Sequence, residues 1–269
     1  MAERYVRVQG EGGIYYGLLE VNLSVHLLSA APWLGGEATG KILPPETYTL
    51  LPPCEPQKIV GVGKNYRAHA LELGTEPPKE PLIFLKATSA LIGSQQPIIL
   101  PTQSSRVEYE GELALVIGQT CRHVSPDHAL NYVWGYTIAN DVTARDLQRK
   151  DGQWTRAKSF DTFCPLGPWI VRDISPAAHL QTILNNDSVP VQSATIDEML
   201  FPPDVLVSFI SSVMTLYPGD VILTGTPAGV GRIAPGDQVA VEIEGIGRLQ
   251  NPVLVRSGVA EATAGQREG

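Results

Sequence analysis

Short apolar runs, separated by glycine and proline, follow one another along most of this chain. Where apolar and polar residues alternate, the period of two places successive side chains on opposite faces of a strand. Continuously apolar runs, such as 58–63, are typical of strands buried on both faces. The pattern predicts strands over 4–8, 14–21, 24–28, 58–63, 82–86, 108–117, 132–140, 168–171, 221–224 and 239–244.

Helical spacing of apolar residues is confined to a few short segments. Residues 65–73 place Tyr66 and Ala70 on one stripe, and Gly74 follows as a C-terminal cap. Further helices are predicted over 141–149 and 203–216. With 26 glycines and 22 prolines, the chain favours many turns over long helices. We predict a mainly β fold of the α+β kind, with few short helices.

A proline-rich stretch divides the chain. Five prolines lie between residues 44 and 56, and proline cannot donate to a sheet ladder, so this segment is predicted to be an extended connector. We predict a small N-terminal β domain over 1–55, which includes the connector, and a main domain over 56–269.

Charge and cysteine content narrow the function classes. The 269 residues carry a formal net charge of −8, which argues against a broad basic face for nucleic acid. No apolar run is long enough to span a membrane, and no secretory signal opens the chain. The three cysteines, Cys54, Cys121 and Cys164, are far apart and suit free thiols in a reducing compartment. We expect a cytoplasmic protein.

Three acids alternate along the predicted strand 108–117. The period of two puts Glu108, Glu110 and Glu112 on one face, which continues with apolar residues. Burying these carboxylates is costly unless a cation or protons compensate, and carboxylate oxygens suit Mg²⁺ or Mn²⁺. The alternative is a solvated strand end with scattered acids.

Asp141 follows an apolar strand, at a place where side chains project into clefts. It is a candidate third metal ligand. The alternatives are a helix N-cap at Asn140 or Asp141, or a capping box formed by Thr143 and Asp146.

Three further positions offer acid–base or anion-binding chemistry. His69 has a carboxylate three residues later, Glu72, which would orient an imidazole base; a surface ion pair is the alternative. Lys86 and Lys158 are either solvated or placed to neutralise an anionic substrate. The glycine-rich loop 223–231 lacks the spacing of ATP and NAD sites, but its N–H groups, such as that of Gly225, could cradle a carboxylate.

Six motifs succeed one another between residues 58 and 256. They are GVGKNY at 61–66 with His69 and Glu72, FLK at 84–86, YEGEL at 109–113, NDVTARDLQ at 140–148, AKSF at 157–160 and TGTPAGVG at 224–231. In this order they resemble the smaller members of the fumarylacetoacetate hydrolase family, which include acylpyruvases, oxaloacetate decarboxylases and tautomerases, and 2-hydroxyhepta-2,4-diene-1,7-dioate isomerases.

The resemblance implies a fold, a metal and a set of roles. Mixed β-strands would roll into a barrel-like sandwich, usually in a homodimer. Glu110, Glu112 and Asp141 would bind Mg²⁺ or Mn²⁺, with Glu108 as a neighbour. His69 and Glu72 would act as a catalytic dyad on a mobile segment, with Lys158 close to the metal. The substrate contacts would be Arg145, Gln148 and Thr226, and we add Lys86 and Gly225 as candidates.

These parts predict an enzyme acting on a small 2-oxo acid, without nucleic acid or membrane partners. The preferred reaction is cleavage of a C–C bond in a short 2,4-dioxo acid, or decarboxylation of oxaloacetate, through a pyruvate enolate stabilised by the metal. The alternative is keto–enol tautomerisation of oxaloacetate or a 2-hydroxyhepta-2,4-diene-1,7-dioate type of isomerisation. A non-catalytic, metal-dependent binding protein is a third possibility, although it would have no use for His69 beside Glu72.

Overall fold

Strands dominate the structure. The computed structural model describes residues 2–255. The strands are β1 (Tyr5–Gly10), β2 (Gly13–Leu19), β3 (Val25–Leu28), β4 (Ala38–Leu43), β5 (Tyr48–Leu50), β6 (Ile59–Gly63), β7 (Leu82–Lys86), β8 (Leu91–Ile92), β9 (Ile98–Leu100), β10 (Val107–Tyr109), β11 (Gly111–Ile117), β12 (Val133–Asn140), β13 (Thr143–Ala144), β14 (Cys164–Val171), β15 (His179–Leu184), β16 (Gln192–Thr195), β17 (Val221–Leu223), β18 (Gly231–Arg232), β19 (Gln238–Ile243) and β20 (Gly247–Val255). The predicted mainly β class is confirmed.

The helices are few and short, as predicted. The α-helices are α1 (Arg67–Glu72), α2 (Pro126–Ala129), α3 (Arg145–Asp151), α4 (Thr155–Lys158) and α5 (Pro203–Val213). Four 3₁₀ turns cover Pro32–Leu34, Thr88–Ala90, Leu130–Tyr132 and Ile196–Glu198. Within residues 2–255, no helix combines the length and the apolar character that a membrane crossing requires.

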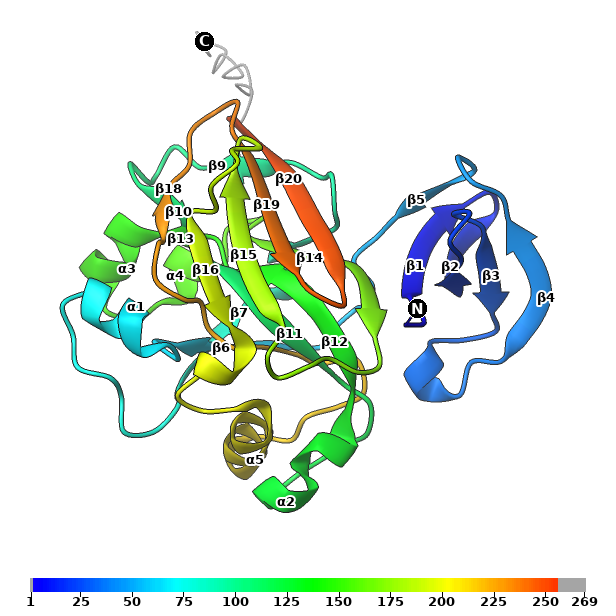
Figure 1. The fold of residues 1–269 in the computed structure, drawn as a ribbon, viewed down its shortest axis with the longest axis horizontal. Coiled ribbons are helices and arrows are strands. Elements are labelled where there is room, and N and C mark those ends of the chain that lie inside the picture. Colours follow the sequence, from blue (N-terminus) through cyan, green and yellow to red (C-terminus); the bar gives the residue numbers. More distant parts are fainter. Residues whose placement is uncertain (1, 256–269) are drawn as a thin grey trace, which may run out of the picture.

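One large sheet runs through the molecule. Its twelve strands follow the order β4-β3-β2-β1-β14-β12-β11-β17-β6-β7, with β5 paired to β1 and β8 to β14. The first five strands form a lobe at one side of the molecule (Figure 1), and β1 connects it to β14 where Tyr5 pairs with Ile170. This lobe has a small core of its own, built on Val6, Val8 and Val25.

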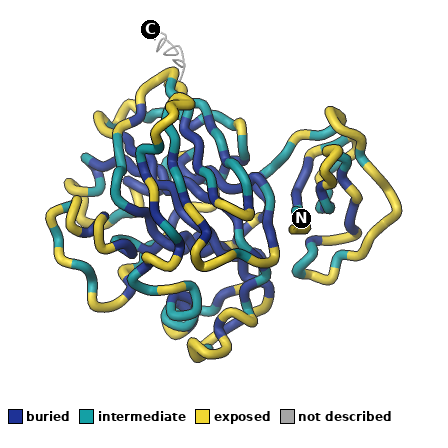
Figure 2. Tube along the Cα trace, viewed as in Figure 1, coloured by how far each residue is buried: buried dark blue, intermediate teal, exposed yellow. Residues whose placement is uncertain are grey.

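A second sheet covers the centre of the first. Its five strands follow the order β16-β15-β19-β20-β9, and β15, β19 and β20 contact β11, β12 and β14 (Figure 1). Apolar side chains from both sheets, such as Leu113, Ile138 and Val241, fill the space between them. Figure 2 shows these central strands buried, with exposed residues at the loops. The arrangement is a sandwich of mixed sheets.

The strand predicted over 108–117 is interrupted, and that prediction is wrong at one residue. β10 ends at Tyr109 and pairs with β13 and β18 in a separate three-stranded sheet, whereas β11 begins at Gly111 in the large sheet. Glu110 therefore occupies the junction between two sheets. Beyond it the predicted alternation is confirmed, because Leu113, Leu115 and Ile117 lie in one core and Ala114 and Val116 in another.

The helix predicted from Asp141 begins four residues later. Thr143 and Ala144 pair with β10, so α3 starts at Arg145. The N-cap of α3 is Ala144, without a capping side chain, so both capping alternatives are wrong. Asp141 is thereby left outside any helix, with its carboxylate available to the site.

Candidate active site

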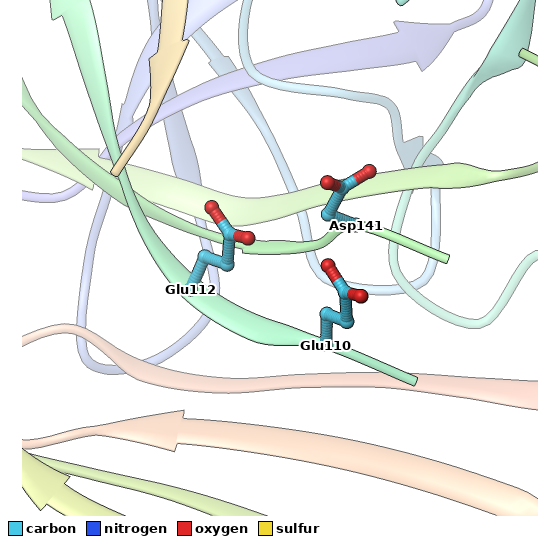
Figure 3. Close-up of side chains that lie close together, drawn as sticks. All are labelled: Glu110, Glu112 and Asp141. Atoms are coloured by element: carbon cyan, nitrogen blue, oxygen red, sulfur yellow. The ribbon is translucent and has the colours of Figure 1, made fainter. Parts of the chain in front are cut away.

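Three carboxylates meet where two neighbouring strands end. β11 and β12 are antiparallel with Gly111 opposite Asn140, so the next residues outward, Glu110 and Asp141, lie side by side. The N–H of Asp141 donates to the carbonyl oxygen of Glu110 (2.8 Å), and the N–H of Glu110 donates to Asn140 Oδ1 (2.9 Å). Glu112 projects from β11, and one carboxylate oxygen of each acid lies within 4.8 Å of the other two (Figure 3).

Buried cations partner two of these acids. Lys158 Nζ donates to Glu110 Oε2 at 2.7 Å and also to Asp141. Lys86 Nζ lies 2.5 Å from Asp141 Oδ1, and Arg145 forms an ion pair with Glu110. Burial by itself would raise the pKa of Glu110, but the charges of Lys158 and Arg145 hold that pKa well below its usual value.

Glu112 lacks such a partner. Its carboxylate forms no ion pair with any residue among 2–255, and Glu112 Oε2 accepts a hydrogen bond from the backbone N–H of Gly225 at 2.7 Å. Burial, together with the charges of Asp141 and Glu110, raises the pKa of Glu112 well above its usual value. A buried carboxylate beside two others needs a proton or a further cation.

The donor set fits a hard divalent cation. Carboxylate oxygens are the ligands that Mg²⁺ and Mn²⁺ prefer, and the converging oxygens of Glu110, Glu112 and Asp141 could hold such an ion. Lys86 and Lys158 offset part of the negative charge, and the uncompensated carboxylate of Glu112 is the group that a bound cation would stabilise.

A cavity of about 220 Å³ adjoins this cluster. It is smaller than pockets for drug-sized molecules, so it suits a short substrate. The sequence-predicted site residues that line it are His69, Glu110, Glu112, Arg145, Gln148, Lys158 and Thr226.

The other predicted site residues do not line the cavity. The side chain of Lys86 is completely buried and contacts Asp141, so Lys86 supports the acidic cluster and does not line the cavity. Gly225 directs its N–H to Glu112. A side chain at position 225 would strain the backbone, because φ is +97° there and a Cβ would lie 2.7 Å from Asn65 Cβ.

His69 and Glu72 form a linked pair. His69 Nδ1 lies 3.0 Å from Glu72 Oε2, and Glu72 Oε1 accepts from the Gly229 N–H at 3.0 Å. A carboxylate only accepts hydrogen bonds, so Nδ1 carries the proton and Nε2 is the basic nitrogen. The His69 side chain is only 4% exposed, so the surface-pair alternative is wrong for this residue.

Two arrangements had no signal in the sequence. Glu108 is not one of the three clustered acids; it forms ion pairs with Arg106 and with Arg145, and Arg145 also pairs with Glu110. Gln192 is buried; it donates to Thr226 Oγ1 at 2.7 Å and accepts from the Gly111 N–H at 3.0 Å. These bonds connect β16 to the start of β11 and to the loop after β17. A lone glutamine in a polar segment gives no pattern to recognise.

Other cavity residues lay within or beside recognised motifs. Lys64, Arg149 and Trp154 line the cavity, and Lys64 belongs to the motif at 61–66. Asn65, from the same motif, is buried and bonds to the backbone of Phe201 and Thr224. Their place in the motif at 61–66 is the feature of the sequence from which Lys64 and Asn65 could have been predicted as site residues.

Comparisons with known proteins identify the family of this chain. Residues 58–254 match the model of the fumarylacetoacetate (FAA) hydrolase C-terminal domain, and residues 3–53 match the Rv2993c-like, N-terminal model. The human protein named oxaloacetate tautomerase FAHD2A, mitochondrial, is 44% identical over 225 residues, which cover 79% of this chain and 72% of that protein.

Solved structures share the fold over nearly the whole chain. The 2-hydroxyhepta-2,4-diene-1,7-dioate isomerase from Mycobacterium marinum is 44% identical, with a TM-score of 0.88 and coverage of 96% of this chain and 100% of that one. The fumarylacetoacetate hydrolase from Exiguobacterium antarcticum is 35% identical, with a TM-score of 0.84 and coverage of 95% and 100%. Because the family model matches residues 58–254 and these relatives are 35% identical or more, this chain belongs to the fumarylacetoacetate hydrolase family.

Proposed function

We propose that this protein catalyses the keto–enol tautomerisation of a short 2-oxo acid of the oxaloacetate type, with Mg²⁺ or Mn²⁺ as cofactor. The observation that carries the proposal is the His69 imidazole in a small cavity that Glu110 and Glu112 of the acidic cluster also line. The relatives named as tautomerase and isomerase support it, since both names describe proton transfer without loss of a carbon unit.

Glu110, Glu112 and Asp141 would hold the cation. When bound, it would supply Lewis-acid polarisation of a keto group. His69 Nε2 would take a proton from the carbon next to that keto group and return it to the keto oxygen, which gives the enol, and Glu72 would keep the imidazole in the correct tautomer. Lys158 and Arg145, which pair with the acids, would hold Glu110 ionised as a ligand.

Cleavage of a C–C bond is the second candidate. The same imidazole could deprotonate a water that attacks a 4-oxo carbonyl, and a relative is named as a fumarylacetoacetate hydrolase. Loss of CO₂ from oxaloacetate would need no water at all. Homodimer formation and a cytoplasmic location stay predictions of the sequence.

Product analysis separates these reactions. The protein, loaded with Mg²⁺ or Mn²⁺, is given the enol form of oxaloacetate, and the enol absorbance and the pyruvate concentration are followed together. Tautomerisation consumes the enol without catalysed release of pyruvate. Release of pyruvate at the rate of enol loss would favour cleavage, which acetylpyruvate and fumarylpyruvate then test. No acceleration with any of these acids would contradict both candidates.

Metal dependence has its own prediction. Glu112→Gln removes the carboxylate that has no cationic partner, so we expect Mg²⁺ binding by calorimetry to weaken by at least about tenfold and turnover to fall with it. The melting temperature without metal should not fall, since the amide replaces a buried carboxyl group that forms no ion pair within residues 2–255. The matched control is Glu242→Gln, in a half-buried pair with Arg248. Unchanged Mg²⁺ binding in Glu112→Gln would contradict the metal site.

A further inference from the structure

The cations closest to the acidic cluster form ion pairs with carboxylates of the protein itself. Arg145 donates from Nε to Glu108 at 2.6 Å, from one terminal nitrogen to Gln148 Oε1 at 2.7 Å, and from the other to Glu110. The Lys158 ammonium donates to two carboxylates of the cluster. Their charges are therefore largely neutralised before a substrate enters, so neither residue supplies a free positive charge for a second anionic group.

Two other cations line the same cavity. Lys64 is half-buried and Arg149 is exposed, and neither forms an ion pair within residues 2–255. In a protein with a net charge of −8, two uncompensated positive charges at one small cavity create a local field that attracts anions.

The backbone at Lys64 is unusual for a lysine. Its φ is +58°, the left-handed region that glycine or asparagine adopts at lower cost. The strand β6 ends at Gly63, where a Cβ would lie 2.7 Å from the ring of Trp154, another cavity residue. A long cationic side chain at a position that favours glycine indicates that the side chain itself has a use.

We propose that Lys64 and Arg149 bind the distal carboxylate of a 2-oxo dicarboxylate, and so select dicarboxylates over 2-oxo acids with a neutral tail. This inference rests on the proposed function, because the 2-oxo acid end of the substrate is assigned to the acidic cluster. The substrate's second carboxylate then meets Lys64 and Arg149, the cavity cations that form no ion pair among the described residues. Charge-assisted hydrogen bonds from lysine and arginine give this recognition its strength.

Two variants test the selection. Lys64→Gly removes the amine and also relieves the left-handed backbone, so it should fold at least as stably as the parent. Arg149→Ala removes the guanidinium, and Lys150→Ala, on the same helix and exposed, is its matched control. Each substrate is assayed with the protein loaded with Mg²⁺.

For Lys64→Gly and Arg149→Ala we expect KM for oxaloacetate to rise about tenfold, with kcat changed by less than about threefold. The kcat/KM for acetylpyruvate, which carries a neutral tail, should stay unchanged, as should both substrates with Lys150→Ala. An equal loss on oxaloacetate and acetylpyruvate, or no loss on either, would overturn the proposal.

Calorimetric binding measurements test the selection of dicarboxylates independently of which reaction the protein catalyses. Calorimetric titrations in Mg²⁺ compare 2-oxoglutarate with 2-oxopentanoate, which differ by a distal carboxylate against a methyl group. Weaker binding of 2-oxoglutarate alone in Lys64→Gly supports the proposal, even if the protein turned over no 2-oxo acid and the proposed function failed. Equal binding of the pair by the parent protein would overturn the proposal while leaving the reaction intact.

Discussion

At the scale of single residues, charge compensation decides which acids form the site. Glu110 and Asp141 each contact a buried lysine, and Glu108 pairs with two arginines. Within residues 2–255, Glu112 has only a backbone N–H as donor. Removing one partner of a buried ion pair is far more costly than losing an exposed one. In this site every acid except Glu112 therefore has a cationic partner among the described residues.

Asp146 shows the opposite behaviour, a carboxylate stabilised as an anion. Partial burial would raise the pKa of Asp146, but donors from Ser104, Ser105 and the Leu147 N–H lower it to about 2. Because the folded-state pKa is depressed, this stabilisation is present above the unfolded pKa near 4 and is lost as the pH falls toward 2.

Asp146→Asn should therefore lower the free energy of unfolding by about 1 kcal/mol at pH 7. The difference from the parent protein should shrink between about pH 4 and pH 2, as measured by urea unfolding. The control is Asp161→Asn, an exposed carboxylate with no ion pair within residues 2–255. A difference for Asp146→Asn that is constant across this pH range would contradict the assignment.

At the scale of elements, the short helix α1 carries the dyad to the cavity. Glu72 bridges His69 on this helix to Gly229 in the loop after β17, so two segments far apart in sequence set the orientation of one imidazole. The helix is anchored on its inner side by buried Tyr66 and Ala70. A six-residue helix is not stable alone and depends on these contacts.

His69→Ala should lower kcat by about 100-fold or more, since a positioned general base contributes that much, while Mg²⁺ binding stays within about twofold of the parent. Glu72→Gln should lower kcat by about tenfold, because this change weakens the orientation of the His69 imidazole but leaves the base in place. His26→Ala, an exposed histidine of β3, is the control. Turnover by His69→Ala at the parent rate would refute the dyad.

At the scale of the whole molecule, Trp169 connects the N-terminal lobe to the central sandwich. Its side chain packs against the apolar clusters of both parts, its Nε1 donates to the Ile246 carbonyl at 2.6 Å, and Arg4 lies 5.1 Å from the ring centre. The lobe thus shares both a sheet and a side-chain contact with the main body.

Trp169→Ala should lower the free energy of unfolding by about 3 kcal/mol, from the loss of aromatic packing on two clusters. Trp169→Phe keeps a ring and loses the hydrogen bond, so about 1 kcal/mol is expected. Equilibrium urea unfolding measures both. A change below about 0.5 kcal/mol for Trp169→Ala would show that the lobe and the body do not depend on this contact.

Local patterns in the sequence predicted about half of the strands and three of the five α-helices within residues 2–255. The strand 82–86 has the predicted bounds, and the helix predicted over 203–216 forms as α5 with its last turn absent. Strands such as β15 and β16 were missed, because polar residues interrupt them and leave no clear apolar alternation. The three cysteines are free, as predicted.

For the site, the sequence by itself identified Glu110, Glu112, Asp141, His69 and Glu72 as candidates, because motifs and short-range spacing are local properties. Only the tertiary structure decided that Glu110 lies at a junction of two sheets and that Lys86 contacts Asp141 behind the cavity lining. It also decided that Lys64 and Arg149 have no carboxylate partner in the part of the chain that the structure describes. The physical reason is that charge compensation depends on which side chains meet across strands far apart in sequence, and strand register sets those meetings.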